Sequence, residues 1–189
     1  FYRIIKWSIY YFLKTTIFYR NTVIFIIGNL PDYYSNDFES SIEDWIVGVS
    51  TDLATAGVWE LAEPVATFND DNYQVQPGAD NTSDGTFCFI TGNGFEEGNG
   101  GFDDVDGGET TLLSPIFDLE GFDEIVLTYW RWYTNNVGDN GNNDVWSVSV
   151  SNDGGNIWHS LEYTSGSNTS WEKKRFILSN YVELTNNIQ

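Results

Sequence analysis

The sequence predicts an all-β protein, built as an antiparallel β-sandwich of two sheets. From residue 32 onward, short runs of β-branched and aromatic residues alternate with loops rich in Gly, Asn and Asp, and no stretch has the apolar period of a helix. The chain also has 8 Trp, 11 Tyr and 13 Phe. These aromatic side chains can fill a large core, so the net charge of −20 does not indicate disorder.

Five segments are predicted to be strands, because β-branched or aromatic residues fill them and turn residues flank them. They are residues 45–49, 86–90, 125–133, 145–151 and 174–178. Strands at this spacing, joined by long polar loops, are typical of an antiparallel sandwich.

Residues 1–31 differ from the rest of the chain. They are apolar and β-branched, hold four of the 8 basic residues and contain no acid. The longest uncharged run, residues 21–31, is too short to span a bilayer, and no signal-peptide cleavage site follows the apolar part. Three interpretations are open: the tail of an upstream domain, a membrane-proximal segment, or sequence that is not natively coding. We therefore set this atypical segment apart and assign residues 32–189 to the sandwich.

The acidic balance limits the classes of partner. Residues 32–189 hold all 28 acidic residues and only four basic ones. Such a body repels nucleic acid and anionic membrane surfaces and attracts divalent cations. We therefore expect no nucleic-acid partner and no membrane insertion.

Residues 151–158, SNDGGNIW, fit the Asp-box pattern S-x-D-x-G-x-x-W, which is best known from propeller glycosidases. Propellers carry the box several times, whereas this chain has it once. The expected role is a structural turn. Asp153 accepts backbone N–H groups across it, Gly154 and Gly155 supply positive φ, and Trp158 covers the hairpin on the returning strand.

Two acidic loops are candidates for cation binding. Residues 94–109 are rich in Gly and acids, and Asp104 and Asp106 alternate as in loops that supply oxygen ligands to Ca²⁺. The spacing is not that of an EF-hand, and a solvated acidic loop explains it equally well. Residues 139–144 could bind a cation too, but turn chemistry alone accounts for them.

The aromatic strand YWRWY at residues 129–133 suggests either sugar binding or core packing. Trp130 and Trp132 share one face of the predicted strand, and Arg131 points to the other. Exposed Trp rings could stack on a pyranose with Arg131 nearby, whereas buried rings would fill the core. The period alone does not say which face is buried.

Catalytic signatures are scarce. His159 is the only histidine, so a zinc site rich in His is impossible within this chain. No G-x-S-x-G motif is present. Carboxylate pairs suited to glycoside hydrolysis are not informative in so acidic a chain. We expect no enzymatic activity from this chain itself, although it can be part of a larger secreted enzyme.

The order of several motifs resembles MAM-like jelly-roll modules over roughly residues 34–189. The early motifs are DFE at 37–39, DW at 44–45, WE at 59–60, D-x-T at 80–82 and GTF at 85–87. Three later motifs are similar to bacterial modules attached to secreted metallopeptidases, including immune-inhibitor-A-like proteases and zinc carboxypeptidases. These are DVDGGETTLLSPIFDL at 104–119, YWRWYTN at 129–135 and SNDGGNIW at 151–158.

The resemblance implies a two-sheet jelly roll that is non-catalytic, secreted and often stabilised by Ca²⁺. In such folds a Glu near the first strand, here Glu39, joins loop acids at the metal. We pair it with Asp80, Asp104, Asp106 and Asp144. The cysteines of vertebrate MAM modules are missing, so their disulfides are not implied. The last strand of the relatives follows residue 189, so the resemblance implies a sandwich truncated before that strand and a metal site that lacks its contribution.

We therefore expect a calcium-stabilised accessory or adhesion module of a secreted multidomain protein, located outside the cell or at its surface. One expected partner is the catalytic domain of the same polypeptide, which we expect to be an extracellular peptidase. The other expected partner is a carbohydrate or a cell-surface protein. A carbohydrate-binding module that uses exposed aromatic residues is the alternative, and a glycosidase fragment is a third hypothesis.

Overall fold

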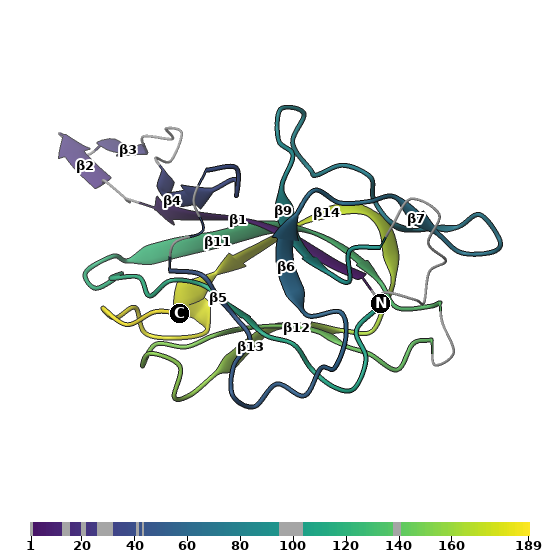
Figure 1. Cartoon of the computed structure of the whole chain (residues 1–189). Helices are drawn as coiled ribbons and strands as arrows, with labels where there is room; N and C mark the ends of the chain where they lie inside the picture. The colour runs from purple at the N-terminus through teal and green to yellow at the C-terminus, as the bar shows by residue number, and fades with distance from the viewer. Residues whose placement is uncertain are drawn as a thin grey trace.

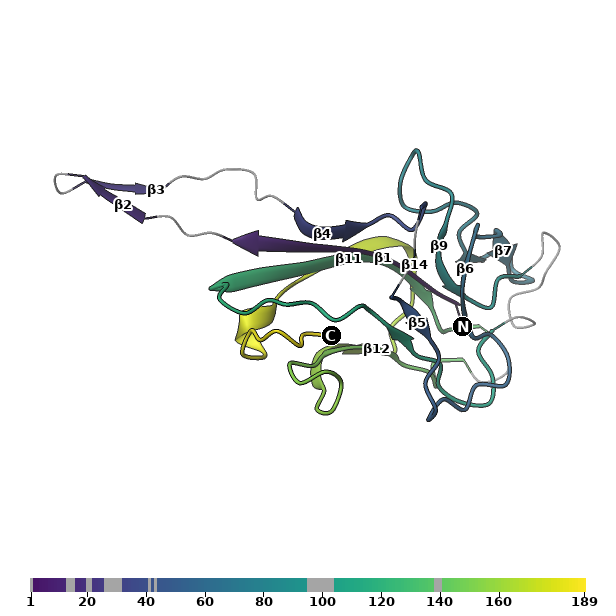
Figure 2. The same ribbon diagram turned by 60° about the vertical axis from the view of Figure 1, so that its left-hand side comes forward.

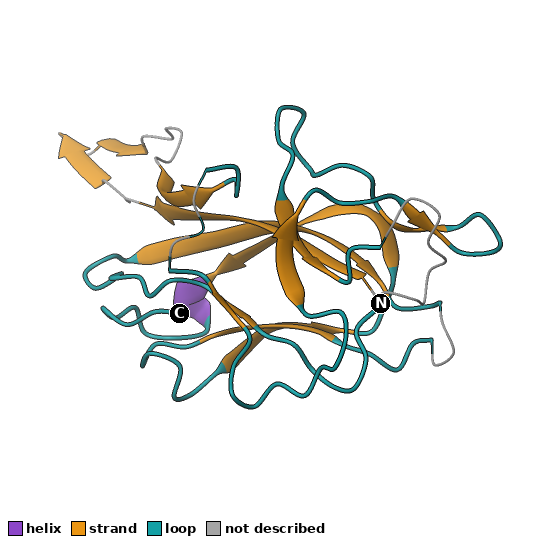
Figure 3. Ribbon diagram, in the orientation of Figure 1, coloured by secondary structure: helices purple, strands orange, loops and turns teal. Residues whose placement is uncertain are grey.

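The computed structural model describes residues 2–12, 16–19, 22–25, 32–40, 42, 44–94, 104–137 and 141–189, and up to residue 32 it describes the backbone alone. In these ranges the chain forms strands and one short 3-10 turn, η1 (Leu178–Asn180), so the predicted all-β class is confirmed (Figure 3). The strands are β1 (Tyr2–Phe12), β2 (Thr16–Tyr19), β3 (Thr22–Phe25), β4 (Asp32–Asn36), β5 (Ile46–Val47), β6 (Trp59–Ala62), β7 (Thr67–Phe68), β8 (Gln74–Gln76), β9 (Cys88–Thr91), β10 (Leu112–Leu113), β11 (Glu124–Thr134), β12 (Trp146–Val150), β13 (His159–Thr164) and β14 (Asn168–Ile177).

β1 lies in the middle of a six-stranded antiparallel sheet with the order β14–β11–β1–β9–β6 (Figure 1). It pairs with β11 along its whole length, from Tyr2 opposite Thr134 to Phe12 opposite Glu124. The other edge of β1 pairs with β9 and with β4. Residues 2–12, which the sequence analysis set apart, thus share a sheet with strands from the rest of the chain.

Two shorter pairs of strands, β10–β5 and β12–β13, form a second layer that faces the six-stranded sheet (Figure 2). Both pairs are antiparallel. The described strands do not join them into one continuous second sheet. The antiparallel pairing agrees with the predicted all-β class, whereas a second continuous sheet, which a two-sheet sandwich requires, is not formed by the described strands.

The core fills the space between the two layers. Alternate residues of β11 (Ile125, Leu127, Tyr129 and Tyr133) belong to the same buried cluster as Trp146, Val148 and Val150 of β12. The ring of Trp146 lies 6.4 Å from that of Tyr129 and 5.7 Å from that of Tyr133. This period of two is what an extended strand requires to bury one face. Each fully buried side chain of this size contributes about 1.5–3 kcal/mol.

Each of the five segments predicted as strands overlaps one, namely β5, β9, β11, β12 and β14. β14 begins six residues before its predicted start at Lys174, because the polar residues of its first half gave no strand signal. Within the described ranges the structure has no helix with the length and hydropathy of a membrane span.

Candidate functional site

Oxygen atoms from two distant segments converge beside Gly85. Glu39 follows β4, and its Oε1 accepts hydrogen bonds from the amides of Thr86 and Phe87 at 2.9 and 3.0 Å. A β-carbon on residue 85 would stand 2.9 Å from this oxygen. The carboxylate of Glu39 thereby fastens the segment after β4 to the loop that leads into β9.

Asp80 and Thr82 complete this group of oxygens. Asp80 is 7% exposed, and its carboxylate accepts hydrogen bonds from the amide and from the hydroxyl of Thr82. Asp80 Oδ2 and Thr82 Oγ1 both lie even closer than Glu39 Oε1 to the position that a β-carbon of Gly85 would occupy. Only a residue without a β-carbon leaves that space open.

The chemistry of this oxygen cluster, formed by Glu39, Asp80 and Thr82 around Gly85, fits a hard cation. Two carboxylates held near each other repel, and a cation between them would offset that repulsion. Carboxylate and hydroxyl oxygens are ligands that Ca²⁺ accepts, although a complete site needs six to eight oxygens. Thr82 and Gly85 were not named as site residues from the sequence, but both lie within the D-x-T and GTF motifs.

The other three predicted metal ligands lie against different segments. Asp106 is exposed and forms an isolated bridge with Ala56, and Asp104 is half-buried two residues before it. Asp144 uses its backbone carbonyl to accept hydrogen bonds from Tyr133 and Asn135. Among the described residues, no three His, Cys, Asp or Glu side chains converge closely enough to hold a metal ion. Residues 95–103 and 139–140 of the two predicted acidic loops lie outside the described ranges.

The Asp-box forms a turn held by one carboxylate. Asp153 Oδ1 accepts hydrogen bonds from the amides of Ile157 and Asn156, at 2.9 and 3.0 Å, and from the hydroxyl of Ser151 at 2.7 Å. The amide of Ile157 and the hydroxyl of Ser151 lower the pKa of the Asp153 carboxyl, because they stabilise its charged form. The three hydrogen bonds that Asp153 Oδ1 accepts thus all come from residues of the turn itself.

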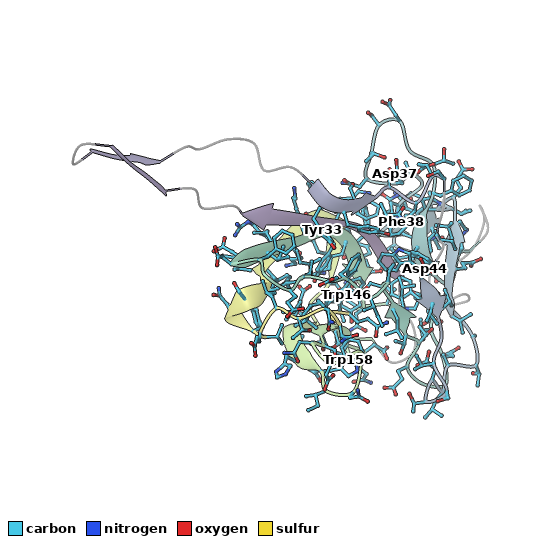
Figure 4. All side chains as sticks on the ribbon, turned by 90° about the vertical axis from the view of Figure 1, so that its left-hand side faces the viewer. Tyr33, Asp37, Phe38, Asp44, Trp146 and Trp158 are labelled. Carbon is cyan, nitrogen blue, oxygen red and sulfur yellow. The ribbon has the colours of Figure 1, made fainter. Side chains whose placement is uncertain are left out.

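The glycines and Trp158 complete the turn as the pattern predicts. Gly154 and Gly155 have φ angles of 71° and 91°, which residues with a β-carbon rarely adopt. A β-carbon on Gly155 would lie 3.3 Å from the Trp158 ring, so the ring packs over the turn. Trp158 remains 41% exposed at the rim of the second layer (Figure 4). His159, the only histidine, is exposed at the start of β13.

Arg131 lies in the core and connects the two layers. It is 4% exposed, and its Nη2 contacts Glu162 of β13 at 2.9 Å and Glu172 of β14 at 3.1 Å. Lys174 contacts the same two carboxylates at 3.3 and 2.7 Å. The hydrogen bond from Lys174, and then the charge of Arg131, lower the pKa of Glu172.

Tyr129 extends this buried ion network, because its hydroxyl donates a hydrogen bond to Glu162. Burial and the neighbouring carboxylate raise the pKa of Tyr129 well above its ordinary value. Two donors of Arg131, Nε and Nη1, are buried without a hydrogen-bond partner. The guanidinium instead stacks 5.7 Å from the Trp146 ring and 5.9 Å from the Tyr133 ring.

The two tryptophans of the aromatic strand do not form an open platform. Trp132 is 7% exposed and packs with Cys88, Ile90 and Trp171 in a second small cluster. Trp130 is half-buried, and the Lys173 ammonium lies 5.9 Å from its ring. A sugar-binding role for Trp130, Arg131 and Trp132 stays a prediction, and their burial gives it no support.

A groove of about 750 Å³ separates the two halves of the second layer. It runs between residues 108–114, which include β10, and residues 143–149, which include β12. Trp45, Trp59 and Trp146, all buried, line it together with the exposed Trp158 and Tyr163. Residues 145–151 were predicted as a strand, whereas β10 at Leu112–Leu113 was not predicted from the sequence.

Comparison of the chain with protein-family models, with curated proteins and with solved structures gives no match.

Proposed function

We propose that the chain is a non-catalytic accessory or adhesion module of a secreted multidomain protein, with a jelly-roll sandwich stabilised by Ca²⁺. The observation that carries the proposal is the oxygen cluster around Gly85. Glu39 and Asp80 come from segments 41 residues apart in the sequence, and their carboxylates point to the same small space. That convergence supplies part of the six to eight oxygen ligands that a structural Ca²⁺ takes.

The cation would be held by Glu39, Asp80 and Thr82, and it would supply charge neutralisation rather than a reactive group. The site's own residues hold the segment after β4 against the loop before β9 through the hydrogen bonds of Glu39. A structural role of this kind suits a module that positions or tethers a catalytic domain of the same polypeptide. The motif order from residues 34 to 189 supports the extracellular setting.

Calcium titration of the full chain tests the proposal. Because a ligand that binds only the folded state stabilises it, Ca²⁺ should raise Tm. At a hundredfold excess of Ca²⁺ over Kd, the free energy of unfolding should increase by about 2.7 kcal/mol. Gly85→Ala should abolish this rise, since the new β-carbon occupies the space between the oxygens. Asp80→Asn should weaken it strongly, since a carboxylate charge is lost.

Gly166→Ala is the matched control for this experiment. A β-carbon there meets only Thr164 Oγ1, at an ordinary 3.4 Å, so the calcium response should remain. Magnesium and NaCl of equal ionic strength separate specific binding from screening of the acidic surface. An equal Tm in excess calcium and in chelator, for the folded wild-type chain, would remove the calcium proposal.

A further inference from the structure

Three adjacent strands of the six-stranded sheet concentrate the positive charge of the chain. β14, β11 and β1 lie side by side, in that order. They hold only two of the chain's 28 acidic residues, Glu124 and Glu172. They also hold six of its 8 basic residues, namely Arg3, Lys6, Arg131, Lys173, Lys174 and Arg175. A molecule with a net charge of −20 thus has one region in which cations outnumber anions.

The register of the strands divides these basic residues between the two faces of the sheet. Lys174 pairs with Tyr129, which belongs to the buried core, so both residues lie on the core face. Lys173 pairs with Trp130 and therefore lies on the outer face, which is turned away from the second layer (Figure 2). The ion network of Arg131 and Lys174 belongs to the core side.

A row of three paired residues crosses the outer face. Lys6 of β1 is opposite Trp130 of β11, and Trp130 is opposite Lys173 of β14. Residues paired across strands share a face, so a basic residue stands at the position on each side of the tryptophan. The next residue on this face of β14 is Arg175, opposite Thr128. Lys173 and Arg175 are both exposed, while Trp130 is half-buried.

The basic positions of the outer face are spread out rather than gathered around one point. Lys173 and Arg175 are two residues apart along β14, which is about 7 Å, and Lys6 is two strands from Lys173, which is about 10 Å. A single small anion is best held by donors that converge on it. Basic residues at this spacing instead suit a ligand that carries several anionic groups.

We propose that the outer face of β14, β11 and β1 binds a short stretch of an acidic polysaccharide, whose carboxylate or sulfate groups contact Lys6, Lys173 and Arg175. The half-buried indole of Trp130 supplies an apolar centre, which the C–H groups of a sugar ring can contact. One such indole is not an open platform for stacking, so charge carries the recognition. β11 and β1 have neighbours on both sides, so side chains rather than sheet edges face the ligand there.

Protection of a sheet edge does not account for this arrangement. β14 is the last strand on its side of the sheet among the described strands, and lysines on an edge strand hinder pairing with other molecules. Lys6, however, is on β1 in the middle of the sheet, where no edge needs protection. Single-stranded nucleic acid is a less suitable ligand, because its bases need exposed aromatic rings on which to stack.

Titration of the full chain with short oligosaccharides, followed by calorimetry, tests this inference. The probes are an oligogalacturonate, which carries carboxylates, a sulfated malto-oligosaccharide, and the neutral malto-oligosaccharide of the same length. We expect at least one acidic probe to bind, and the neutral probe to bind about tenfold or more weakly. Affinity for the acidic probe should fall as NaCl is raised, because salt screens exposed charges.

Reversal of two charges locates the site. Lys173→Glu combined with Arg175→Glu should weaken binding of the acidic probes about tenfold or more, while β14 keeps charges that protect its edge. Lys14→Glu combined with Arg20→Glu is the matched control, because it changes the net charge equally at positions outside the three strands. The control should bind like the parent. If the β14 variant does not fold, protection of Lys173 from amine acetylation by the bound probe decides the question in the parent.

Three results would overturn the inference. They are equal binding of the neutral and acidic probes, no binding at millimolar concentration in low salt, and full binding by the charge-reversed variant. Binding of poly-glutamate in place of the oligosaccharides would also overturn it and assign the face to an acidic polypeptide.

The inference rests on the proposed adhesion role, for which it names a partner, but its residues are separate from the oxygen cluster. The titrations are therefore run in chelator. Binding there, together with no effect of calcium on Tm, would remove the calcium proposal alone. A calcium response without binding of an acidic probe would remove the polysaccharide proposal alone.

Discussion

A single carboxylate organises the Asp-box turn. Asp153 receives the amides of Ile157 and Asn156 and the hydroxyl of Ser151. These donors recognise the charged form, so the pKa of Asp153 is lower in the folded chain than in the unfolded one. The contribution to stability is therefore complete above the unfolded pKa, near 4. It is lost as the pH falls through the folded pKa.

Asp153→Asn should remove this dependence on pH. The variant should be less stable than the parent at pH 6, and the difference in Tm should shrink as the pH falls below about 4. Asp71→Asn, at an exposed acid elsewhere, is the control. Tm measured by circular dichroism across this range checks the expectation. A difference that stays constant down to the lowest pH would mean that Asp153 acts through shape rather than charge.

The two layers of the fold are joined by a charged connection within an aromatic core. Arg131 on β11 meets Glu162 on β13, and both side chains are almost completely buried, at 5% and 11% exposure. Removing Arg131 leaves the buried carboxylate of Glu162 with Lys174 as its one other described cationic partner, whereas removing both Arg131 and Glu162 avoids the cost of a poorly compensated buried charge. We therefore expect the network to favour this arrangement of strands more than it adds to net stability.

A double-mutant cycle measures this connection. Arg131→Met should cost about 3–5 kcal/mol of unfolding free energy, because Glu162 stays buried with Lys174 as its remaining cationic partner. Adding Glu162→Gln should restore a large part of the loss, so the two changes are expected to be strongly non-additive. Urea unfolding of the parent, both single variants and the double variant supplies the numbers. Additive losses would show that the two side chains act independently.

Local patterns predicted the elements better than their arrangement. β12 was predictable because apolar and polar residues alternate along it, and β11 because it is a continuous run of β-branched and aromatic residues, buried on both faces. Asp153 with its glycines specified a turn by chemistry alone. Arg131 was not predictable as a buried ion partner, since Glu162 and Glu172 are distant in sequence. The same holds for Gly85, whose importance depends on Glu39 reaching it. The place of β1 in the sheet is a third such case, because its composition differs from that of its neighbours.

The charge distribution of the whole chain makes the N-terminal segment a distinctive part of the molecule. The first 31 residues are basic and free of acids, whereas the rest holds all 28 acids. Its strand β1 separates β11 from β9 in the sheet, and the hairpin β2–β3 projects away from the two layers (Figure 2). The attraction between opposite charges and the backbone pairing of β1 act in the same direction.

Deletion of residues 1–31 should therefore destabilise the whole molecule rather than trim it. β11 would lose a partner along its 11 residues, and the exposed edges of β11 and β9 would become templates for association. We expect a lower urea midpoint and oligomers in size-exclusion chromatography with light scattering. Replacing only residues 16–25 with a flexible linker, which removes the hairpin but keeps β1, should leave both properties close to the parent. A monomeric deletion variant as stable as the full chain would show that residues 32–189 form the folding unit without β1.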